Sequence, residues 1–84
     1  MAVFTGEIQN VALARELLAS GKGRQFRQQC HLSLGEVAAA LGVSAGLVAK
    51  WETGECRPRK AAALAYAQLL GELLEAFDVE AVDS

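Results

Sequence analysis

The 84-residue sequence is short of several features that mark particular classes of protein. It has one proline and 52% hydrophobic residues, which excludes a disordered chain. It has no uncharged apolar run of about 18 residues, so no membrane partner is expected. Its start lacks the basic flank and cleavage pattern of a signal peptide, so we expect a cytoplasmic protein. The length leaves room for one compact domain with a modest core and excludes a multidomain enzyme.

Cysteine and histidine are also scarce, and are limited to Cys30, Cys56 and His31. Two cysteines can form at most one disulfide, and in a reducing cytosol both are expected to be free thiols. A structural zinc site needs four ligands, and no paired C-x-x-C spacing provides them. No serine or acid completes a recognisable catalytic triad with His31. We therefore expect no metal site, no cofactor and no enzymatic activity.

Charge is distributed unevenly along the chain, although the net charge is only -2. Residues 61–84 contain five acids and no base, and residues 1–21 contain two acids and one base. Residues 22–60 contain seven bases and three acids, a net charge of +4. The basic centre predicts that the middle of the chain meets a polyanion, and the acidic end is expected to do something else.

Apolar residues recur at helical spacing throughout, and the period-two alternation of strands is absent. The sequence therefore predicts an all-α protein. Helical regions are expected over residues 6–19, 24–31, 34–41, 45–53 and 59–77. Gly71 can split the last region into two pieces. The first helix is expected to turn its apolar face to the interior, with Ile8, Val11, Ala14, Leu17 and Leu18.

Residues of capping type mark several helix ends. Thr5 is the candidate N-cap of the first helix, and Gly21 is its stop. Ser33 precedes the third helix, and Glu36 three residues on completes a capping box. Ser44 is the expected N-cap of the fourth helix, so both serines are interpreted as caps rather than as nucleophiles.

The stretch from Leu34 to Gly54 carries the pattern of a helix-turn-helix. Where two short helices cross steeply their backbones come close, and Ala38 supplies the small side chain that this contact requires. Gly42 stands where the turn needs a positive φ, which costs glycine least. The apolar residues expected in one shared core are Val37, Leu41, Val43, Val48 and Trp51.

Further residues around this motif fit the same arrangement. They are Arg27, the Leu32-Ser33 pair, Leu41-Gly42-Val43-Ser44, the Trp51-Glu52-Thr53-Gly54 quartet, Pro58 and the helix from Leu64 to Leu70. With them, the stretch from about Arg24 to Leu74 resembles the phage-repressor-like helix-turn-helix proteins, of the Cro/repressor or Xre-like type. The resemblance implies a compact bundle of about five helices. The expected organisation is an extra, accessory N-terminal helix over 1–21, a DNA-binding domain over 22–78 and an acidic tail over 79–84.

The resemblance also implies a homodimer on double-stranded operator DNA, with residues 45–50 as the recognition helix in the major groove. Ala45 and Leu47 can touch thymine methyl groups, and Lys50 can donate to guanine. Because this outer face has few polar side chains, readout of DNA shape is expected beside direct contacts. The candidate DNA contacts are Arg24, Ser44, Ala45, Gly46, Leu47, Lys50, Thr53, Arg57, Arg59 and Lys60.

One departure from the family pattern and two open alternatives concern these contacts. Leu34 stands where the family usually has a glutamine that holds a phosphate, so only backbone N–H groups remain there. Lys50 is either a base contact or a solvated charge. The bases after the recognition helix are either phosphate contacts or part of an ordinary solvated loop.

An ion pair and a dimer interface complete the expected site. The resemblance implies that Arg27 pairs with Glu52, which lies near a helix C-terminus where a negative charge needs a cationic partner. The last helix is apolar over more of its circumference than one buried side needs, which favours a homodimer interface over a purely internal role. The candidate interface residues are Leu69, Leu70, Leu73, Leu74 and Phe77.

Two further hypotheses come from other classes of function. An antitoxin-like or accessory protein would join the same DNA-binding core to a protein partner, bound through the N-terminal helix or the acidic C-terminus. An adaptor would keep the fold and bind protein only. The bare recognition face and the negative net charge favour the adaptor, and the basic centre opposes it. Fold alone does not choose among these functions.

Overall fold

The residues that the structure describes form helices joined by turns and short loops. A computed structural model of the protein describes the backbone of residues 2–77 and the side chains of residues 6–76. The all-α prediction is confirmed, and the expected acidic tail lies outside the described residues. The helices are α1 (Ala2–Ser20), α2 (Lys22–Gln29), α3 (Leu34–Leu41), α4 (Ala45–Thr53) and α5 (Lys60–Phe77).

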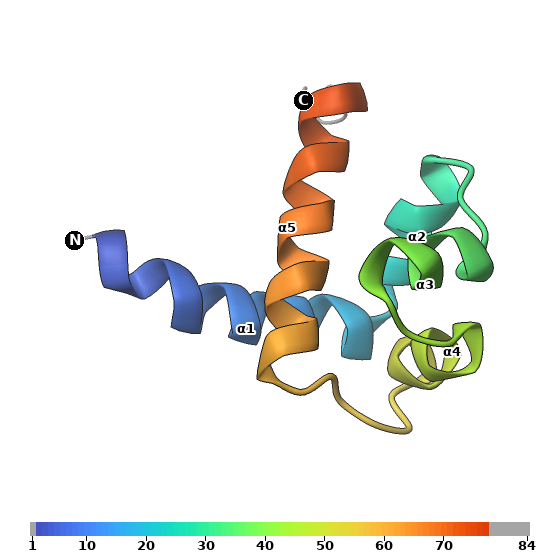
Figure 1. Cartoon of the computed structure of the whole chain (residues 1–84), viewed down its shortest axis with the longest axis horizontal. Helices are drawn as coiled ribbons and strands as arrows, with labels where there is room; N and C mark the ends of the chain where they lie inside the picture. The colour runs from blue at the N-terminus through green and yellow to red at the C-terminus, as the bar shows by residue number, and fades with distance from the viewer. Residues whose placement is uncertain (1, 78–84) are drawn as a thin grey trace.

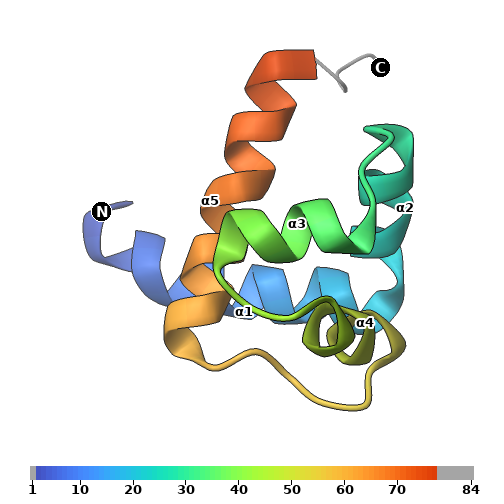
Figure 2. The same cartoon turned by 45° about the vertical axis from the view of Figure 1, so that its right-hand side comes forward.

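Two long helices cross, and three short ones pack beside them. α5 stands across α1, and α2, α3 and α4 lie together on one side of this crossing (Figure 1, Figure 2). The N-terminal turns of α1 extend beyond the other helices (Figure 1). The loop between α4 and α5 runs along the edge of the molecule back to the base of α5. This layout places α4 at an edge of the bundle.

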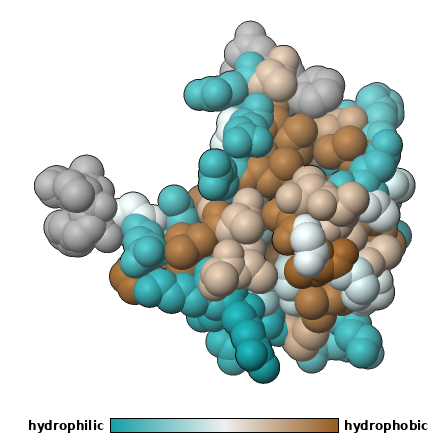
Figure 3. Space-filling model, viewed as in Figure 1, coloured by the Kyte–Doolittle hydropathy of each residue, from teal (hydrophilic) through white to brown (hydrophobic). Residues whose placement is uncertain are grey.

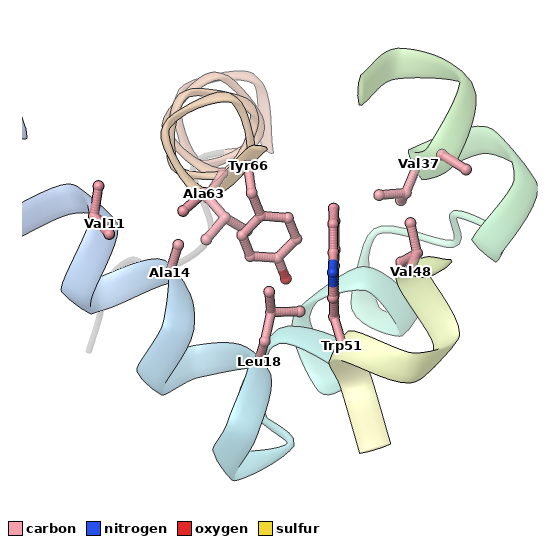
Figure 4. Close-up of a cluster of buried hydrophobic side chains, with 10 residues drawn as sticks. Val11, Ala14, Leu18, Val37, Val48, Trp51, Ala63 and Tyr66 are labelled. Atoms are coloured by element: carbon pink, nitrogen blue, oxygen red, sulfur yellow. The ribbon is translucent and has the colours of Figure 1, made fainter. Parts of the chain in front are cut away.

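The core is built from side chains of four helices. Burying a large apolar side chain stabilises a fold by about 1.5–3 kcal/mol, so this cluster holds the helices together. Because three of its members belong to α1, the N-terminal helix shares one core with the helices that follow. The labelled core residues in Figure 4 are Val11, Ala14, Leu18, Val37, Val48, Trp51, Ala63 and Tyr66.

α1 differs from its prediction at the N-terminal end. It begins at Ala2 rather than at Gly6, so Thr5 lies inside the helix and is not its N-cap. Ile8, which the sequence predicts in the interior, is 67% exposed. The reason is that this half of α1 extends past α5, and no other helix among the described residues lies beside it (Figure 1).

α2 begins at Lys22 and ends at Gln29, two residues earlier at each end than predicted. Gly21, at a φ of 86°, lets the chain turn from α1 into α2 within one residue. His31 adopts a φ of 60°, which is the left-handed conformation. At the C-terminal ends of helices this conformation is usually adopted by glycine. This left-handed residue stops α2 before the predicted end.

α5 is one continuous helix, so Gly71 does not split the last helical region into two pieces. A glycine inside a helix costs only about 1 kcal/mol relative to alanine. Leu70 and Leu73, on either side of it, are buried and half-buried, and their packing offsets this cost. The described bundle therefore has five helices, and the N-terminal helix is one of them.

α3 and α4 form the expected helix-turn-helix. They are bent by 108° relative to each other, within the range of about 90–120° for such motifs. Gly42, at a φ of 74°, ends α3, and its N–H group donates to the carbonyl oxygen of Ala39 at 3.3 Å. The N–H group of Val43 donates to the carbonyl oxygen of Ala38 at 3.0 Å. Ala38 is buried, as the steep crossing requires.

Candidate nucleic-acid interface

α4 has one face in the core and one in solvent. Val48 and Trp51 are buried and belong to the core. On the other side Ala45, Gly46 and Lys50 are exposed, as predicted. A Cβ atom built at Gly46 would meet no neighbour, so the backbone there can be approached closely. The outer face of α4 is therefore open but carries few hydrogen-bonding groups.

The first turn of α4 is fixed by Ser44, as predicted. The Oγ atom of Ser44 accepts a hydrogen bond from the N–H group of Leu47 at 3.1 Å. The side chain of Leu47 is half-buried and packs against the core. The sequence predicts that the whole Leu47 side chain is available to a ligand. Because part of it packs against the core, this turn exposes less apolar surface than predicted.

The first turn of α3 carries the predicted capping box. Ser33 Oγ accepts from the N–H group of Glu36 at 3.0 Å, and Glu36 Oε1 accepts from the N–H group of Ser33 at 2.8 Å. Leu34, in place of the family's glutamine, is half-buried. The carboxylate of Glu36 thus lies at the helix end that the resemblance assigns to a phosphate. A negative charge there opposes the binding of an anion.

Arg24 of α2 and Thr53 at the end of α4 lie near each other. Both line a hollow of about 240 Å³ whose walls come from α2, α3 and α4. The Thr53 hydroxyl donates to the carbonyl oxygen of Lys50 at 3.1 Å, within the last turn of α4. Arg24 is exposed, so its charge is available at the edge of α4.

The loop after α4 presents Arg57 and Arg59 on either side of Pro58. Both arginines are exposed, whereas Pro58 is fully buried. Lys60 begins α5, and its Nζ atom lies 3.4 Å from Oε1 of Glu7 on α1. Both side chains of this pair are exposed, and such pairs contribute about 0–1 kcal/mol. The loop therefore keeps two exposed cations, and Lys60 is drawn toward α1.

Arg15 is a residue that the sequence did not single out. Its Nε–H group donates to the carbonyl oxygen of Pro58 at 3.0 Å. The two residues are 43 positions apart, and no local pattern signals a contact over such a separation. α1 thus reaches the basic loop directly.

Arg27 and Glu52 form the predicted ion pair, and it joins α2 to α4. Arg27 Nε donates to Glu52 Oε2 at 2.8 Å and Arg27 Nη2 donates to Oε1 at 3.0 Å, while Nη1 donates to the carbonyl oxygen of Leu32 at 2.9 Å. The side chains are 13% and 5% exposed. The hydrogen bonds that Arg27 donates to the Glu52 carboxylate raise the pKa of Arg27 above its ordinary value. Burial, helped by the Glu52 charge, raises the pKa of Tyr66 to about 12, so its hydroxyl stays protonated at neutral pH.

The apolar residues of α5 divide between the core and an open groove. Leu70 is buried, Leu69 and Leu73 are half-buried, and Leu74 is 46% exposed; the side chain of Phe77 lies outside the described residues. Figure 3 shows apolar surface beside the C-terminal half of α5. A groove of about 230 Å³ between α1, α2 and α5 is lined by Leu17, Lys22, Gly23, Phe26, Leu70 and Leu74.

The described residues include two free thiols. Cys30 is buried and Cys56 is half-buried. Burial raises the pKa of the Cys30 thiol. Within residues 2–77, no three side chains of histidine, cysteine or acid type lie together as a metal site would require. In the same range no single helix is long and apolar enough to cross a membrane, and only α3 and α4 taken as one bent pair meet that length and composition.

Comparison with known proteins places the chain in a family. A family model described as a helix-turn-helix domain matches residues 24–78, which is more than half of the sequence. No curated protein and no solved structure matches the chain. The matched residues include the bent α3–α4 pair and the ion pair beneath it. The chain belongs to the helix-turn-helix domain family.

Proposed function

We propose that this protein is a transcriptional regulator of the phage-repressor-like type, which binds operator DNA as a homodimer in the cytoplasm and has no catalytic role. The observation that carries the proposal is that α4 has one face buried in the core and the other exposed, at 108° from α3. A helix whose inner face is locked in the core and whose outer face is open can lie in a major groove about 12 Å wide. Membership of the helix-turn-helix family supports DNA as the ligand.

Lys50 is the side chain on which sequence discrimination is expected to depend, because it is the exposed base in α4. Duplexes enriched from a random library by wild-type protein would be compared with scrambled duplexes of equal length. Lys50→Ala is expected to weaken binding to the enriched duplex by about 1–3 kcal/mol, roughly 5- to 160-fold, and to change binding to scrambled DNA much less.

Lys22→Ala is the matched control for Lys50→Ala. It removes the same charge from an exposed position at the start of α2. Because Lys22 also lines the apolar groove proposed as the dimer interface, light scattering would establish that the variant keeps the wild-type oligomeric state. It is expected to affect both duplexes slightly and equally. An equal loss on enriched and scrambled duplexes with Lys50→Ala would contradict a base contact and assign Lys50 to a phosphate.

Glu36 is expected to weaken DNA binding in the native protein. Glu36→Gln removes the charge at the start of α3 and keeps a side chain that can complete the capping box. A carboxylate roughly 7 Å from a phosphate costs about 0.6 kcal/mol in water, so Glu36→Gln is expected to tighten binding about two- to threefold at low salt. Glu72→Gln, at an exposed position of α5, makes the same change in net charge and is the control. Affinities of both variants would be measured by fluorescence anisotropy titration of a labelled duplex. Equal affinities for both variants would show that no phosphate approaches α3.

Dimerisation is supported by the apolar groove and by the exposure of Leu74 at its edge. Leu74→Asp is expected to shift the protein to monomer and to weaken DNA binding, because a charge in an interface core must be desolvated. Leu73 is a poorer choice, since it is half-buried and its replacement would also damage the fold.

Light scattering over a range of concentrations would measure this effect. Ile8→Asp, at a more exposed apolar residue on the extended part of α1, is the control and should leave the dimer intact. A wild-type monomer at high concentration, or a dimer lost through Ile8→Asp instead, would contradict the α5 interface.

A protein partner is the second candidate function, of the antitoxin-like or adaptor kind. The observation that favours it is the exposure of Ile8 and Leu13, at 67% and 50%, on a helix that lies before the matched residues. A protein partner that covered this helix would bury both side chains, which would favour the complex. This candidate takes precedence if the wild-type protein binds no duplex.

A further inference from the structure

We infer that α1 positions the loop of residues 54–59 for contact with the DNA backbone, and that Arg15 is the positioning residue. The inference rests on the proposed function, because the placement of this loop matters to a ligand only if DNA is bound. Its first support is the hydrogen bond of 3.0 Å from Arg15 Nε to the carbonyl oxygen of Pro58. Pro58 is fully buried, and its neighbours Arg57 and Arg59 are exposed cations.

Hydrogen bonds to α4, α1 and α5 hold the loop, and the one from α1 is made in its middle. At its start, the N–H group of Glu55 donates to the carbonyl oxygen of Lys50 at 2.9 Å, in the last turn of α4. At its end, the carbonyl oxygen of Arg59 accepts from the N–H group of Ala63 at 2.8 Å, in the first turn of α5. Between them the loop runs along the edge of the molecule toward the base of α5 (Figure 1, Figure 2). The hydrogen bond from Arg15 therefore adds a link to α1 between the parts of the loop that α4 and α5 hold.

The surface of α1 is also shaped to accommodate Arg57. Two small residues of α1, Ala12 and Ala19, line an open hollow of about 460 Å³ together with Arg15, Glu16 and Arg57. Small side chains leave room for the long arginine to lie beside the helix, and Glu16 partly offsets the two guanidinium charges. The hollow is open to solvent, so a phosphate can reach Arg57 from outside. Phosphate contacts of this kind fix the register of a protein on DNA.

This role gives α1 a function beyond completing the core. The family match begins at residue 24, so the matched residues do not include Arg15. The ion pair between Lys60 and Glu7 is a second link between α1 and this region, but its exposure makes it weak. Arg15 is half-buried, and its bond to Pro58 is the stronger link.

The test uses the full chain with Arg15→Ala, Arg15→Gln and Arg57→Ala. Arg15→Gln places an amide N–H the same number of bonds from the backbone as arginine Nε, so this variant can keep the bond to Pro58 without the charge. Arg15→Ala is expected to weaken duplex binding about three- to tenfold and to lower the salt slope by about one, as Arg57→Ala does. Arg15→Gln is expected to bind nearly as well as wild type. The double variant should bind no more weakly than Arg57→Ala alone, because both changes remove one contact.

A second readout does not depend on DNA. Trypsin cleavage of the bond between Arg59 and Lys60, followed by mass spectrometry, reports how firmly the loop is held. Cleavage is expected to be severalfold faster in Arg15→Ala than in wild type or Arg15→Gln. Circular dichroism would establish that each variant is folded at the assay temperature.

The results that overturn the inference are distinct from those that overturn the proposed function. Additive losses from Arg15→Ala and Arg57→Ala would mean that Arg15 contacts DNA itself. A loss in Arg15→Gln equal to that in Arg15→Ala would make the charge, not the bond to Pro58, the important property. If Arg15→Ala bound DNA with the wild-type affinity and was cleaved at the wild-type rate, the inference would be wrong and the proposed function would stand. Wild-type protein that binds no duplex would defeat the proposed function, and the cleavage rates would still show whether α1 holds the loop.

Discussion

Replacing Arg27 with alanine is expected to lower the free energy of unfolding by about 3 kcal/mol. The change leaves the Glu52 carboxylate, which is only 5% exposed, without its two hydrogen bonds from the guanidinium group. Glu52 also lies in the last turn of α4, where the helix dipole disfavours a negative charge. The cost falls at the lower end of the range for buried pairs, because Arg27 is 13% exposed and water reaches part of it.

A double-mutant cycle measured by thermal or urea denaturation would isolate the interaction. Glu52→Ala is expected to cost less than Arg27→Ala, since Arg27 keeps its bond to the carbonyl oxygen of Leu32. Replacing both residues should cost less than the sum of the two single changes. Glu7→Ala breaks the exposed pair with Lys60 and serves as the control, with a change of about 0.5 kcal/mol or less. Purely additive losses would show that Arg27 and Glu52 do not stabilise each other.

Gly23→Ala is expected to destabilise the fold by about 1–3 kcal/mol, although alanine normally favours a helix by about 0.5–1 kcal/mol over glycine. Gly23 is buried in the first turn of α2. A Cβ atom there would overlap the hydroxyl oxygen of Tyr66 and would lie 3.3 Å from a methyl group of Leu18. Tyr66 and Leu18 are both in the core, so neither can move away without disturbing the packing of α1 against α5.

The same substitution at Gly35 is the matched control. Gly35 is exposed in α3, and the nearest atom to an added Cβ is the Oγ of Ser33 at 3.8 Å, so Gly35→Ala should leave stability unchanged or raise it. Tyr66→Phe removes the overlapping oxygen, and Gly23→Ala should therefore cost less when combined with it. Thermal denaturation of the four variants and wild type decides the matter. An equal cost of Gly23→Ala with and without the Tyr66 hydroxyl would show that the overlap is not the cause.

The helix-turn-helix could be predicted from the sequence because its determinants are local. Ser33 and Ser44 cap helices through bonds to residues three positions away, and Gly42 turns the chain by its own φ. Such rules act within a few residues, so α3 and α4 have the predicted bounds. Helix ends without a strong local signal were predicted less well. Thr5 has the chemistry of a cap, but nothing before it stops the helix, and Gly71 is too weak a breaker to end α5.

The candidate site could be predicted only where a resemblance or a helical face supplied the information. The pair Arg27 and Glu52 followed from the resemblance, and the exposed face of α4 followed from its periodicity. The bond from Arg15 to Pro58 could not be predicted, because it joins residues that meet only through the crossing of α1 with the rest of the bundle. The half-burial of Leu47 depends on the same three-dimensional packing.

Titration of a labelled duplex with wild-type protein at increasing salt concentration tests the central claim, that the open face of α4 and the bases around it bind DNA. Fluorescence anisotropy would follow binding from about 50 mM salt upward. The account predicts measurable binding at the lowest salt, and a linear fall of log affinity with log salt concentration as phosphate contacts release counterions. Absence of binding to every duplex at about 50 mM salt would contradict the account and favour a protein partner instead.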